Sequence, residues 1–444
     1  MFKTVRNALK IKDIRNKLIY TFIALIIVRL GSQLPIPGVD KDYFTSFFDQ
    51  QTALNFFDAM TGGSFTRMSI FALSITPYIT SSIIMQLLTI AIPKLEEMQK
   101  DGEEGRKKIA EYTRYVTVAL AFIESLAMAI GFGNQGLLEG GITVTNVAVI
   151  VVSLTAGSAF LMWMGERITE KGVGNGISIV LLINIVSRVP SDLASLYTQF
   201  IATATVMNKI IAAVVIIVVI VGMVVFIIAL QNGERRIPVQ YAKKVQGRKM
   251  VGGQSSHIPL KVNTAGVIPV IFAGSLLSFP IVIAQIMGIA PASGAGASLA
   301  QKILKIFNQD AWCNIKNFGE FKYTLGLLIY IALVIFFAYF YTSVTFNPIE
   351  VSNNMKKQGG FIPGIRPGKP TTDYLTKVLN NVIFIGACGL TFIAVVPIFF
   401  SGVFKANVSF SGTSLIIIVG VVLETIKQIE SQMLVRHYKG FLND

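Results

Sequence analysis

Apolar segments as long as a lipid bilayer is thick recur along the whole chain. A helix needs about 20 predominantly apolar residues to cross the hydrocarbon core, and the sequence offers ten such segments. Only 14% of the residues are charged, against about 25% in a soluble domain. The chain is therefore predicted to be an all-α polytopic membrane protein. The expected spans lie near 17–34, 70–92, 113–133, 146–165, 175–190, 210–231, 264–289, 323–346, 374–399 and 413–430.

Lys and Arg residues are distributed unevenly over the segments between these spans. Twenty-nine of the 39 fall on one alternating set, which begins with residues 1–17 and ends with 427–439. Cytoplasmic loops carry an excess of Lys and Arg, so this set is predicted to be cytoplasmic together with both termini. Residues 1–17 are basic and amphipathic and lead into a full-length apolar run, so we predict no cleavable signal peptide there.

Two of the expected cytoplasmic loops are long. Residues 232–263 alternate between apolar and polar side chains around RIPVQY and HIPLKV, which predicts a β-hairpin. Residues 347–372 are punctuated by Pro and Gly, which predicts an irregular chain that is helical only near 348–357.

Glycines mark two further short features. Residues 52–65 predict a helix of at most two turns, ended by Gly62 and Gly63 and too short to span a membrane. The stretch KGVGNGISI at 171–179 superficially resembles a phosphate-binding loop. A nucleotide site would need a preceding strand and a soluble βαβ unit, whereas this stretch joins two expected spans. It predicts a tight turn between closely packed helices.

Basic side chains on the two long loops have two interpretations. Positive charge orients helices in the membrane, and that alone explains part of the set. Cations in the middle of a loop also suit an anionic partner such as RNA phosphate or an acidic protein face. Both interpretations remain open. The cations are Arg235, Arg236, Lys243, Lys244, Arg248, Lys249, Lys356, Lys357, Arg366 and Lys369.

The second span is unusually polar for a membrane helix. Residues 72–88 read ALSITPYITSSIIMQLL, with five Ser or Thr residues, Gln86 and, in the first half, Pro77. A proline inside a helix removes a backbone hydrogen bond, and hydroxyls often mediate helix contacts in membranes. Ile75 and Ile79 lie four residues apart and share a face. Ile177 and Leu181 repeat that spacing, and ordinary packing explains either pair.

Catalytic and coupled-transport chemistry finds little support in the sequence. The only histidines are His257 and His437, and the chain shows no metal-ligand spacing and no nucleophile beside a base. Glu124 is the one carboxylate in the middle of a span. It is either a functional residue or a structural group that is protonated or hydrogen-bonded to a neighbouring helix. A polytopic secondary transporter for a small solute remains the alternative. Cys313 and Cys388 lie in a loop and a span, so no disulfide framework is predicted.

Several long motifs, in order and over essentially the whole chain, resemble those of the SecY family, the channel subunit of the bacterial protein translocase. The stretches that carry the resemblance are SIFALSITPYITSSIIMQLL at 69–88, GRKKIAEYTRY at 105–115, LMWMGERITEKGVGNGISI at 161–179, QGRKMVGGQSSHIPLKVNTAGVIP at 246–269, FNPIEVSNNMKKQGGFIPGIRPGKPT at 346–371 and SGTSL at 411–415.

The resemblance implies ten helices in two pseudo-symmetric halves of five around an hourglass pore. Residues 1–190 would form the first half and 210–444 the second, joined by an extracellular hinge connection at 191–209. A ring of apolar side chains would close the waist of the pore. By motif position these are Ile75, Ile79, Ile177, Leu181, Ile271 and Ile417.

The resemblance also implies a plug and a lateral gate. The plug would be the short helix within 52–66, with Leu54, Asn55, Phe56, Phe57, Met60, Gly62 and Gly63. Spans 2 and 3 against 7 and 8 would form a gate toward lipid, with Thr80 and Gln86 in it. The hydroxyls of span 2 and Gln86 would then line water or face span 7.

A protein-conducting channel without cofactor is the activity that the resemblance implies. It would translocate unfolded secretory polypeptides, admit signal sequences and release membrane segments laterally into the lipid of the bacterial cytoplasmic membrane. Implied partners are the small subunits SecE and SecG, the SecA motor ATPase and the ribosome. SecA and the ribosome, including its RNA, would dock on Lys243, Lys244, Arg248, Lys249, Lys356, Lys357 and Arg366.

Overall fold

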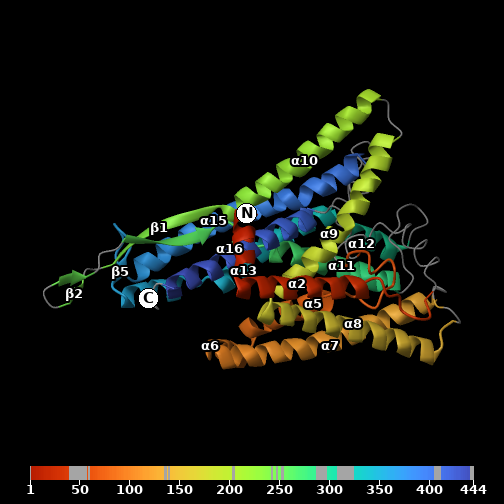
Figure 1. Ribbon diagram of the computed structural model, residues 1–444, viewed down its shortest axis with the longest axis horizontal. Coiled ribbons are helices and arrows are strands. Elements are labelled where there is room, and N and C mark those ends of the chain that lie inside the picture. Colours follow the sequence, from red (N-terminus) through yellow and green to blue (C-terminus); the bar gives the residue numbers. More distant parts are fainter. Residues whose placement is uncertain are drawn as a thin grey trace.

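Figure 1 shows the computed structural model of the protein, an elongated bundle of long helices that carries a β-sheet at one end. Most long helices run along the longest axis of the molecule, and α10 leans away from the bundle toward the end opposite the sheet. The structure describes residues 2–39, 58, 61–134, 138, 141–202, 206–241, 244–246, 249–251, 255–286, 298–307, 325–404 and 412–440.

The helices fall into two groups along the sequence. The first group consists of α1 Phe2–Lys10, α2 Lys12–Gly31, α5 Thr76–Ala91, α6 Pro93–Lys100, α7 Glu103–Asn134, α8 Val144–Lys171, α9 Gly176–Leu196 and the π-helical turn η2 Tyr197–Ala202. The second consists of α10 Val206–Asn232, α11 Ile268–Ile286, α12 Leu299–Phe307, α13 Leu325–Thr345, α14 Pro348–Lys357, α15 Lys369–Phe404 and α16 Gly412–Gly440.

Each apolar segment that was expected to span a membrane coincides with a helix. In the part of the chain that the structure describes, six helices are long and apolar enough to cross a bilayer, namely α7, α8, α9, α10, α13 and α15. α5 and α6 form one more candidate as a pair bent by 101°. α2, α11 and α16 occupy the remaining expected segments. The expected connection at 191–209 is helical through Ala202, because α9 runs directly into η2.

The second expected span is helical over a shorter stretch than 70–92. Residues 70–75 form turns, in which Ser74 adopts a φ of 51°. Pro77 therefore lies in the first turn of α5, where the N–H that it lacks would have no intrahelical partner. The expectation that Pro77 removes a backbone hydrogen bond is wrong for this reason. At the other end Ile92 is extended before Pro93, the conformation that a following proline favours.

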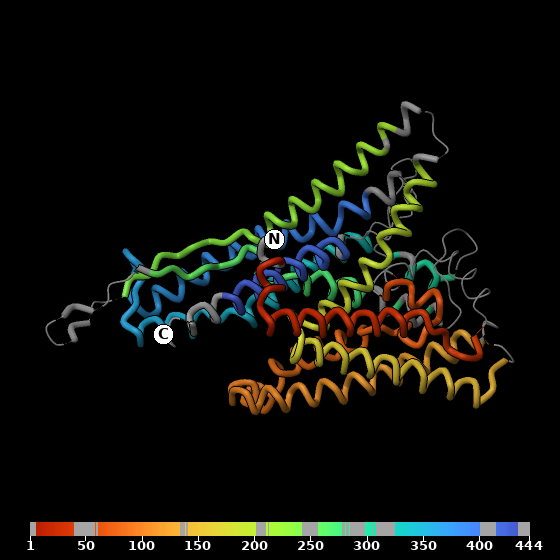
Figure 2. Tube along the Cα trace, in the orientation of Figure 1, coloured from red at the N-terminus to blue at the C-terminus, as the bar shows by residue number. Residues whose placement is uncertain are grey.

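Two apolar cores each lie within one group of helices. One joins α7 and α8 to the chain between Ile36 and Leu73. The other joins α10, α11, α13, α15 and α16. α7 packs against α5 and α8, and α13 packs against α11 and α15. Figure 2 shows that α1 runs across the bundle and turns sharply into α2. α1 contacts both α2 and α16.

The predicted β-hairpin at 232–263 is confirmed. β1 Glu234–Tyr241 pairs antiparallel with β4 Ser255–Lys261, and Ile237 lies opposite Ile258. The short strands β2 Lys244–Gln246 and β3 Lys249–Val251 pair with each other between them. The other edge of β1 pairs with β5 Gly360–Phe361. Because β5 belongs to 347–372, the two long loops form one structural unit.

The helix predicted near 348–357 is confirmed as α14. The side chain of Asn347 accepts hydrogen bonds from the backbone N–H groups of Ile349 (3.1 Å) and Glu350 (3.4 Å), and Pro348 opens the helix. Asn is a strong N-cap residue and proline is favoured at the first helical position. One apolar cluster then binds the sheet, α14 and α15 together through Ile237, Val239, Leu260, Met355, Ile362, Leu375, Leu379 and Ile383.

Candidate functional site

A third apolar cluster lies between the two groups of helices. It contains side chains from α2, α8 and α9 of the first group and from α11 and α16 of the second. All six residues expected to close a pore belong to this cluster or pack against it. Ile75, Leu181, Ile271 and Ile417 are buried members, and Ile79 and Ile177 are half-buried beside them.

The start of α9 positions Ile177 and Leu181. Asn175 caps the helix by accepting hydrogen bonds from the N–H groups of Ile177 (3.1 Å) and Ser178 (3.3 Å). A Cβ on Gly176 would overlap the backbone carbonyl of Gly165 in α8, so only glycine permits this approach. The tight turn and close helix contact predicted for 171–179 are thereby confirmed.

Polar contacts that the sequence did not predict hold the chain just before α5. Asn184 on α9 donates a 3.2 Å hydrogen bond to the hydroxyl of Ser74, and the hydroxyl of Ser158 on α8 donates a 3.2 Å bond to the carbonyl of Ser74. These contacts stabilise the left-handed conformation of Ser74 and so place Ile75, the next residue, in the cluster. Asn184 is 3% exposed. An asparagine in the apolar run LLINIV was the sequence signal that could have predicted a buried polar contact here.

Most of the residues expected in the plug lie outside the described chain: Leu54, Asn55, Phe56, Phe57 and Met60. The end of the segment is described. Thr61 is its last helical residue, and Gly62 and Gly63 follow with φ of 69° and 81°. The predicted end of the short helix at these glycines is confirmed, because the left-handed region at a helix end favours glycine.

Asp58 is a buried carboxylate that the sequence analysis did not select. Its Oδ1 accepts 3.0 Å hydrogen bonds from both the N–H and the hydroxyl of Thr66, and its Oδ2 forms an ion pair with Arg188 on α9. Arg188 also lies 3.9 Å from Asp192. We call Asp58 and residues 61–66 the anchor turn. It joins the segment before α5 to the far end of α9.

The polar side chains of α5 differ in what they face. Ser81 is buried and donates a 2.7 Å hydrogen bond to the carbonyl of Thr113, while the hydroxyl of Thr117 donates to Ser81 at 2.9 Å. This buried hydroxyl of span 2 therefore faces α7, the third span, and the expectation that it lines water or faces span 7 is wrong. Thr80 bonds within its own helix, and Gln86 is exposed with a 3.5 Å contact to Ser82.

The basic side chains sit on the unit formed by the two long loops. Lys356, Lys357 and Arg366 are exposed. Gly364 and Gly368 bracket Arg366 with positive φ of 82° and 106°, and the carbonyl of Arg366 accepts a 2.8 Å hydrogen bond from Thr371. The side chains of Lys244 and Lys249, on β2 and β3, are not described, and Lys243 and Arg248 lie outside the described residues.

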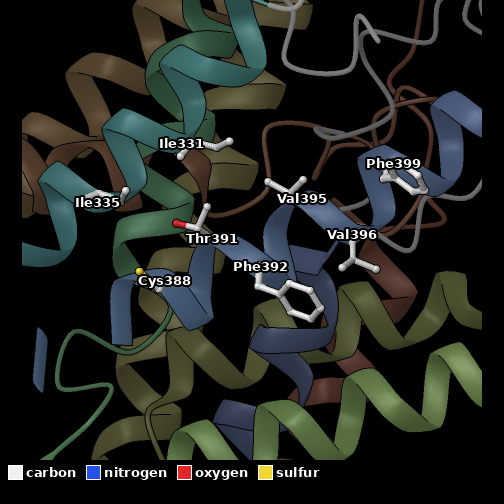
Figure 3. A pocket seen from close by; sticks show the side chains of 8 residues that line it. All are labelled: Ile331, Ile335, Cys388, Thr391, Phe392, Val395, Val396 and Phe399. Carbon is white, nitrogen blue, oxygen red and sulfur yellow. The ribbon is translucent and has the colours of Figure 1, made fainter. Parts of the chain in front are cut away.

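One cavity of the second group of helices is a candidate site for a small solute. Figure 3 shows an apolar cavity of about 550 Å³ between α13 and α15. Thr391 is the only lining residue with a hydroxyl or charged group, whereas solute pockets combine apolar walls with several convergent polar groups. The described residues hold no group of His, Cys, Asp or Glu that could bind a metal ion. The lining residues are Ile331, Ile335, Cys388, Thr391, Phe392, Val395, Val396 and Phe399.

The fold and the apolar cluster define a class: a polytopic α-helical membrane protein whose two groups of helices meet at a buried apolar seam. A SecY family model matches residues 69–426. The chain is 43% identical over 449 residues, covering all of both chains, to the protein translocase subunit SecY of Halalkalibacterium halodurans. The chain belongs to the SecY family, which confirms the resemblance found in its motifs.

Solved structures share the fold. One is a SecY channel whose plug domain is described as stabilising the closed state and maintaining a membrane seal. It has a TM-score of 0.58 and 16% identity, and the match covers 95% of this chain and 92% of that one. Another is Sec61 in a canine ribosome–channel complex, with a TM-score of 0.54 and 15% identity, covering 95% and 93%.

Proposed function

We propose that this chain is the protein-conducting channel of a bacterial translocase and passes unfolded polypeptides through the apolar seam between its two groups of helices. One observation carries the proposal. Six apolar side chains from α9, α11, α16 and the start of α5 gather in a single cluster that joins both groups. Relatives in the family are named protein translocase subunits, and a solved structure with this fold is named a protein conducting channel. The chain is therefore not an enzyme, and energy for transport comes from a partner.

The chemistry of the six-residue ring suits a channel that must open for polypeptides and stay closed to ions. Apolar side chains form a constriction that expels water and so blocks ions. Each contact between such a side chain and a passing residue is weak, about 0.1–0.2 kcal/mol per pair of atoms, so no sequence is trapped. A charged wall would bind some translocated side chains and delay them.

The finer architecture that we propose has ten spans. Four of them are α2, α11, α16 and the α5–α6 pair, beside the six helices that qualify on length and composition alone. Residues 1–190 and 210–444 form two halves, and 191–209 connects them outside. The distribution of Lys and Arg supports cytoplasmic termini, since positive charge favours the cytoplasmic side. The protein is a multi-pass membrane protein, and the bacterial origin of its relatives supports the cytoplasmic membrane as its proposed location.

The proposed plug is the segment that ends in the anchor turn, and the proposed lateral gate lies where α5 and α7 meet α11 and α13. Direct packing of α7 on α11 supports a seam between the halves at this position. Thr80 and Gln86, on α5, are the gate residues of this proposal. Signal sequences are apolar helices, so they would leave the pore through such a seam by partitioning into lipid.

The exposed cations of the sheet end are the proposed docking surface for the ribosome and for SecA. This chain shares its fold with Sec61 in a ribosome–channel complex, which supports the ribosome as a partner. The rigid turn around Arg366 supports a contact that needs a guanidinium in a fixed place. SecE and SecG are the proposed membrane subunits, on the basis of the family alone.

Site-specific photo-crosslinking tests the proposed path. A photoreactive amino acid is placed in turn at Ile79, Ile177 and Ile271, and a secretory chain is stalled in the reconstituted channel. Crosslinks from all three positions support a central path. The control position is Val218 on α10, which is 62% exposed on an apolar face. A stalled chain that crosslinks from Val218 and from none of the three would contradict the proposal.

A further inference from the structure

One face of α9 changes character along its length. Ile177, Leu181, Asn184 and Arg188 follow each other at spacings of four, three and four residues, so they lie in one stripe of the helix. The first two belong to the apolar ring. The last two lie beside the anchor turn: Arg188 pairs with Asp58, and the backbone carbonyl of Asn184 lies against Gly62. The same stripe therefore forms the ring at one end and carries the anchor turn at the other.

The anchor turn fits this helix closely. A Cβ on Gly62 would lie 2.7 Å from the carbonyl oxygen of Asn184 and 2.9 Å from the hydroxyl of Ser187. That hydroxyl lies 3.5 Å from the carbonyl of Gly62, to which it donates. Since real Cβ atoms do not approach within 3.0 Å, only glycine lets the turn sit this close to α9.

Asp58 connects the turn and the helix through its two oxygens. Oδ1 holds the turn in shape by accepting two hydrogen bonds from Thr66. Oδ2 is paired with Arg188, and the side chain of Asp58 is 3% exposed while that of Arg188 is 21% exposed. Removing one partner of a buried ion pair leaves an uncompensated charge and is strongly destabilising. The contact between the anchor turn and α9 therefore depends on both charges.

We propose that the Asp58–Arg188 ion pair is an electrostatic lock that holds the anchor turn on α9 and keeps the resting channel closed. This inference rests on the proposed channel function and deepens it. Asp192 makes the lock reversible. Asp192 lies one helical turn from Arg188, and its Oδ1 is 3.9 Å from a guanidinium nitrogen. The guanidinium therefore keeps a carboxylate partner when the anchor turn dissociates from α9. The free energy needed to open the lock is correspondingly smaller than for an isolated buried pair.

Ion conductance of the resting channel tests the lock. The full chain with its membrane subunits is reconstituted in a planar lipid bilayer without a translocating polypeptide. Asp58→Asn keeps the shape and the Oδ1 acceptor for Thr66 but removes the charge, and Arg188→Gln removes the partner. We expect either variant to raise the resting conductance by at least about tenfold, which corresponds to about 1.4 kcal/mol. Arg188→Lys keeps the positive charge opposite Asp58 and is expected to leave the conductance close to that of the unmodified channel.

A second measurement reports the position of the turn directly. Ser187 is replaced by cysteine after Cys313 and Cys388 have been changed to serine, and a membrane-impermeant maleimide is added outside. Asp58→Asn is expected to speed labelling of position 187 at least about tenfold, by the same free-energy difference. Arg67→Gln is the matched control, because Arg67 follows the anchor turn directly but pairs with Gln33 and not with α9.

The outcomes separate the lock from the channel function. Unchanged conductance and labelling in Asp58→Asn, in a channel that still translocates, would overturn the lock alone. An Arg188→Lys variant that leaks as much as Arg188→Gln would overturn it as well, since the positive charge would then not be the cause. A chain that shows no crosslink from Ile79, Ile177 or Ile271 would instead overturn the proposed function.

Discussion

The hydroxyl of Ser81 donates a 2.7 Å hydrogen bond to the backbone carbonyl of Thr113, which joins α5 to α7 inside the first group of helices. Both residues are buried, and the hydroxyl of Thr117 completes the chain of bonds by donating to Ser81. At Ser81 the polar character of span 2 thus serves helix packing, in keeping with the use of hydroxyls as interhelical contacts in membranes.

Replacing Ser81 by alanine should weaken this contact modestly. Interhelical hydrogen bonds in membranes are worth about 0.6 kcal/mol on average. The hydroxyl of Thr117 lies 2.6 Å from the carbonyl of Thr113 and donates its one proton there when Ser81 no longer accepts it. We expect a small fall in the midpoint of thermal unfolding, measured in lipid nanodiscs. Ser82→Ala is the control, since the hydroxyl of Ser82 has a single hydrogen bond among the described residues, a 3.5 Å contact with the exposed Gln86. An equal fall in the control would contradict this assignment.

Gly157 should tolerate no side chain. A Cβ there would overlap the backbone carbonyl of Ile70, so Gly157→Ala must push α8 away from the turns that lead to Ile75. Overpacking of this kind costs about 1–3 kcal/mol, and we expect a clear loss of thermal stability. Gly222→Ala on α10 is the matched control, because nothing lies within 4 Å of its added Cβ. In that open position alanine favours the helix, so the control should be neutral or slightly stabilising.

The ring should lose its seal when one member becomes polar. Ile417→Asn brings an amide into a cluster in which Ile417 is 3% exposed, and an amide holds water where an apolar side chain expels it. We expect the resting ion conductance to rise about tenfold, equivalent to about 1.4 kcal/mol. Ile417→Val keeps the position apolar and should leave conductance near that of the unmodified channel. An Ile417→Asn variant with unchanged resting conductance would show that the constriction does not include Ile417.

Features encoded locally were predicted well from the sequence. The apolar runs predicted the helices, and the alternation around RIPVQY and HIPLKV predicted the hairpin of β1 and β4. Asn347 and Pro348 together begin α14 where it was expected. Each of these depends on neighbouring residues, so periodicity and capping residues suffice to predict it.

Features that depend on distant residues were not visible in the sequence pattern. Ser74 adopts a left-handed conformation because Asn184 and Ser158 bind it, whereas the surrounding sequence reads as a continuous apolar helix. Asp58 is a single acid in a short apolar stretch, and its partner Arg188 lies five elements later. Ile75 and Ile417 lie near opposite ends of the chain, and only the resemblance to a family, not spacing, suggested that they share a site.

Glu124 distinguishes a channel from a coupled transporter. It is half-buried on α7 and has no hydrogen-bond or ion-pair partner among the described residues. A transporter that couples transport to protons would need this carboxylate. A channel driven from outside would not, so Glu124→Gln should keep the translocation rate within about twofold, or about 0.4 kcal/mol. Loss of translocation in Glu124→Gln, in a protein that still folds, would contradict this.

Arg366 should matter for docking and not for the fold or the seal. Its side chain is exposed, and the surrounding turn uses only its carbonyl, which accepts from Thr371 at 2.8 Å. Arg366→Glu reverses a charge at the proposed docking surface, where close charge pairs contribute at least about 1.5 kcal/mol. We therefore expect SecA-driven translocation into proteoliposomes to slow about tenfold or more, while thermal stability and resting conductance stay unchanged. Arg366→Lys keeps the charge but loses the planar, bidentate guanidinium, so an intermediate rate would indicate that geometry contributes beside charge. Equal rates for Arg366→Glu and the unmodified channel would exclude this residue from the docking contact.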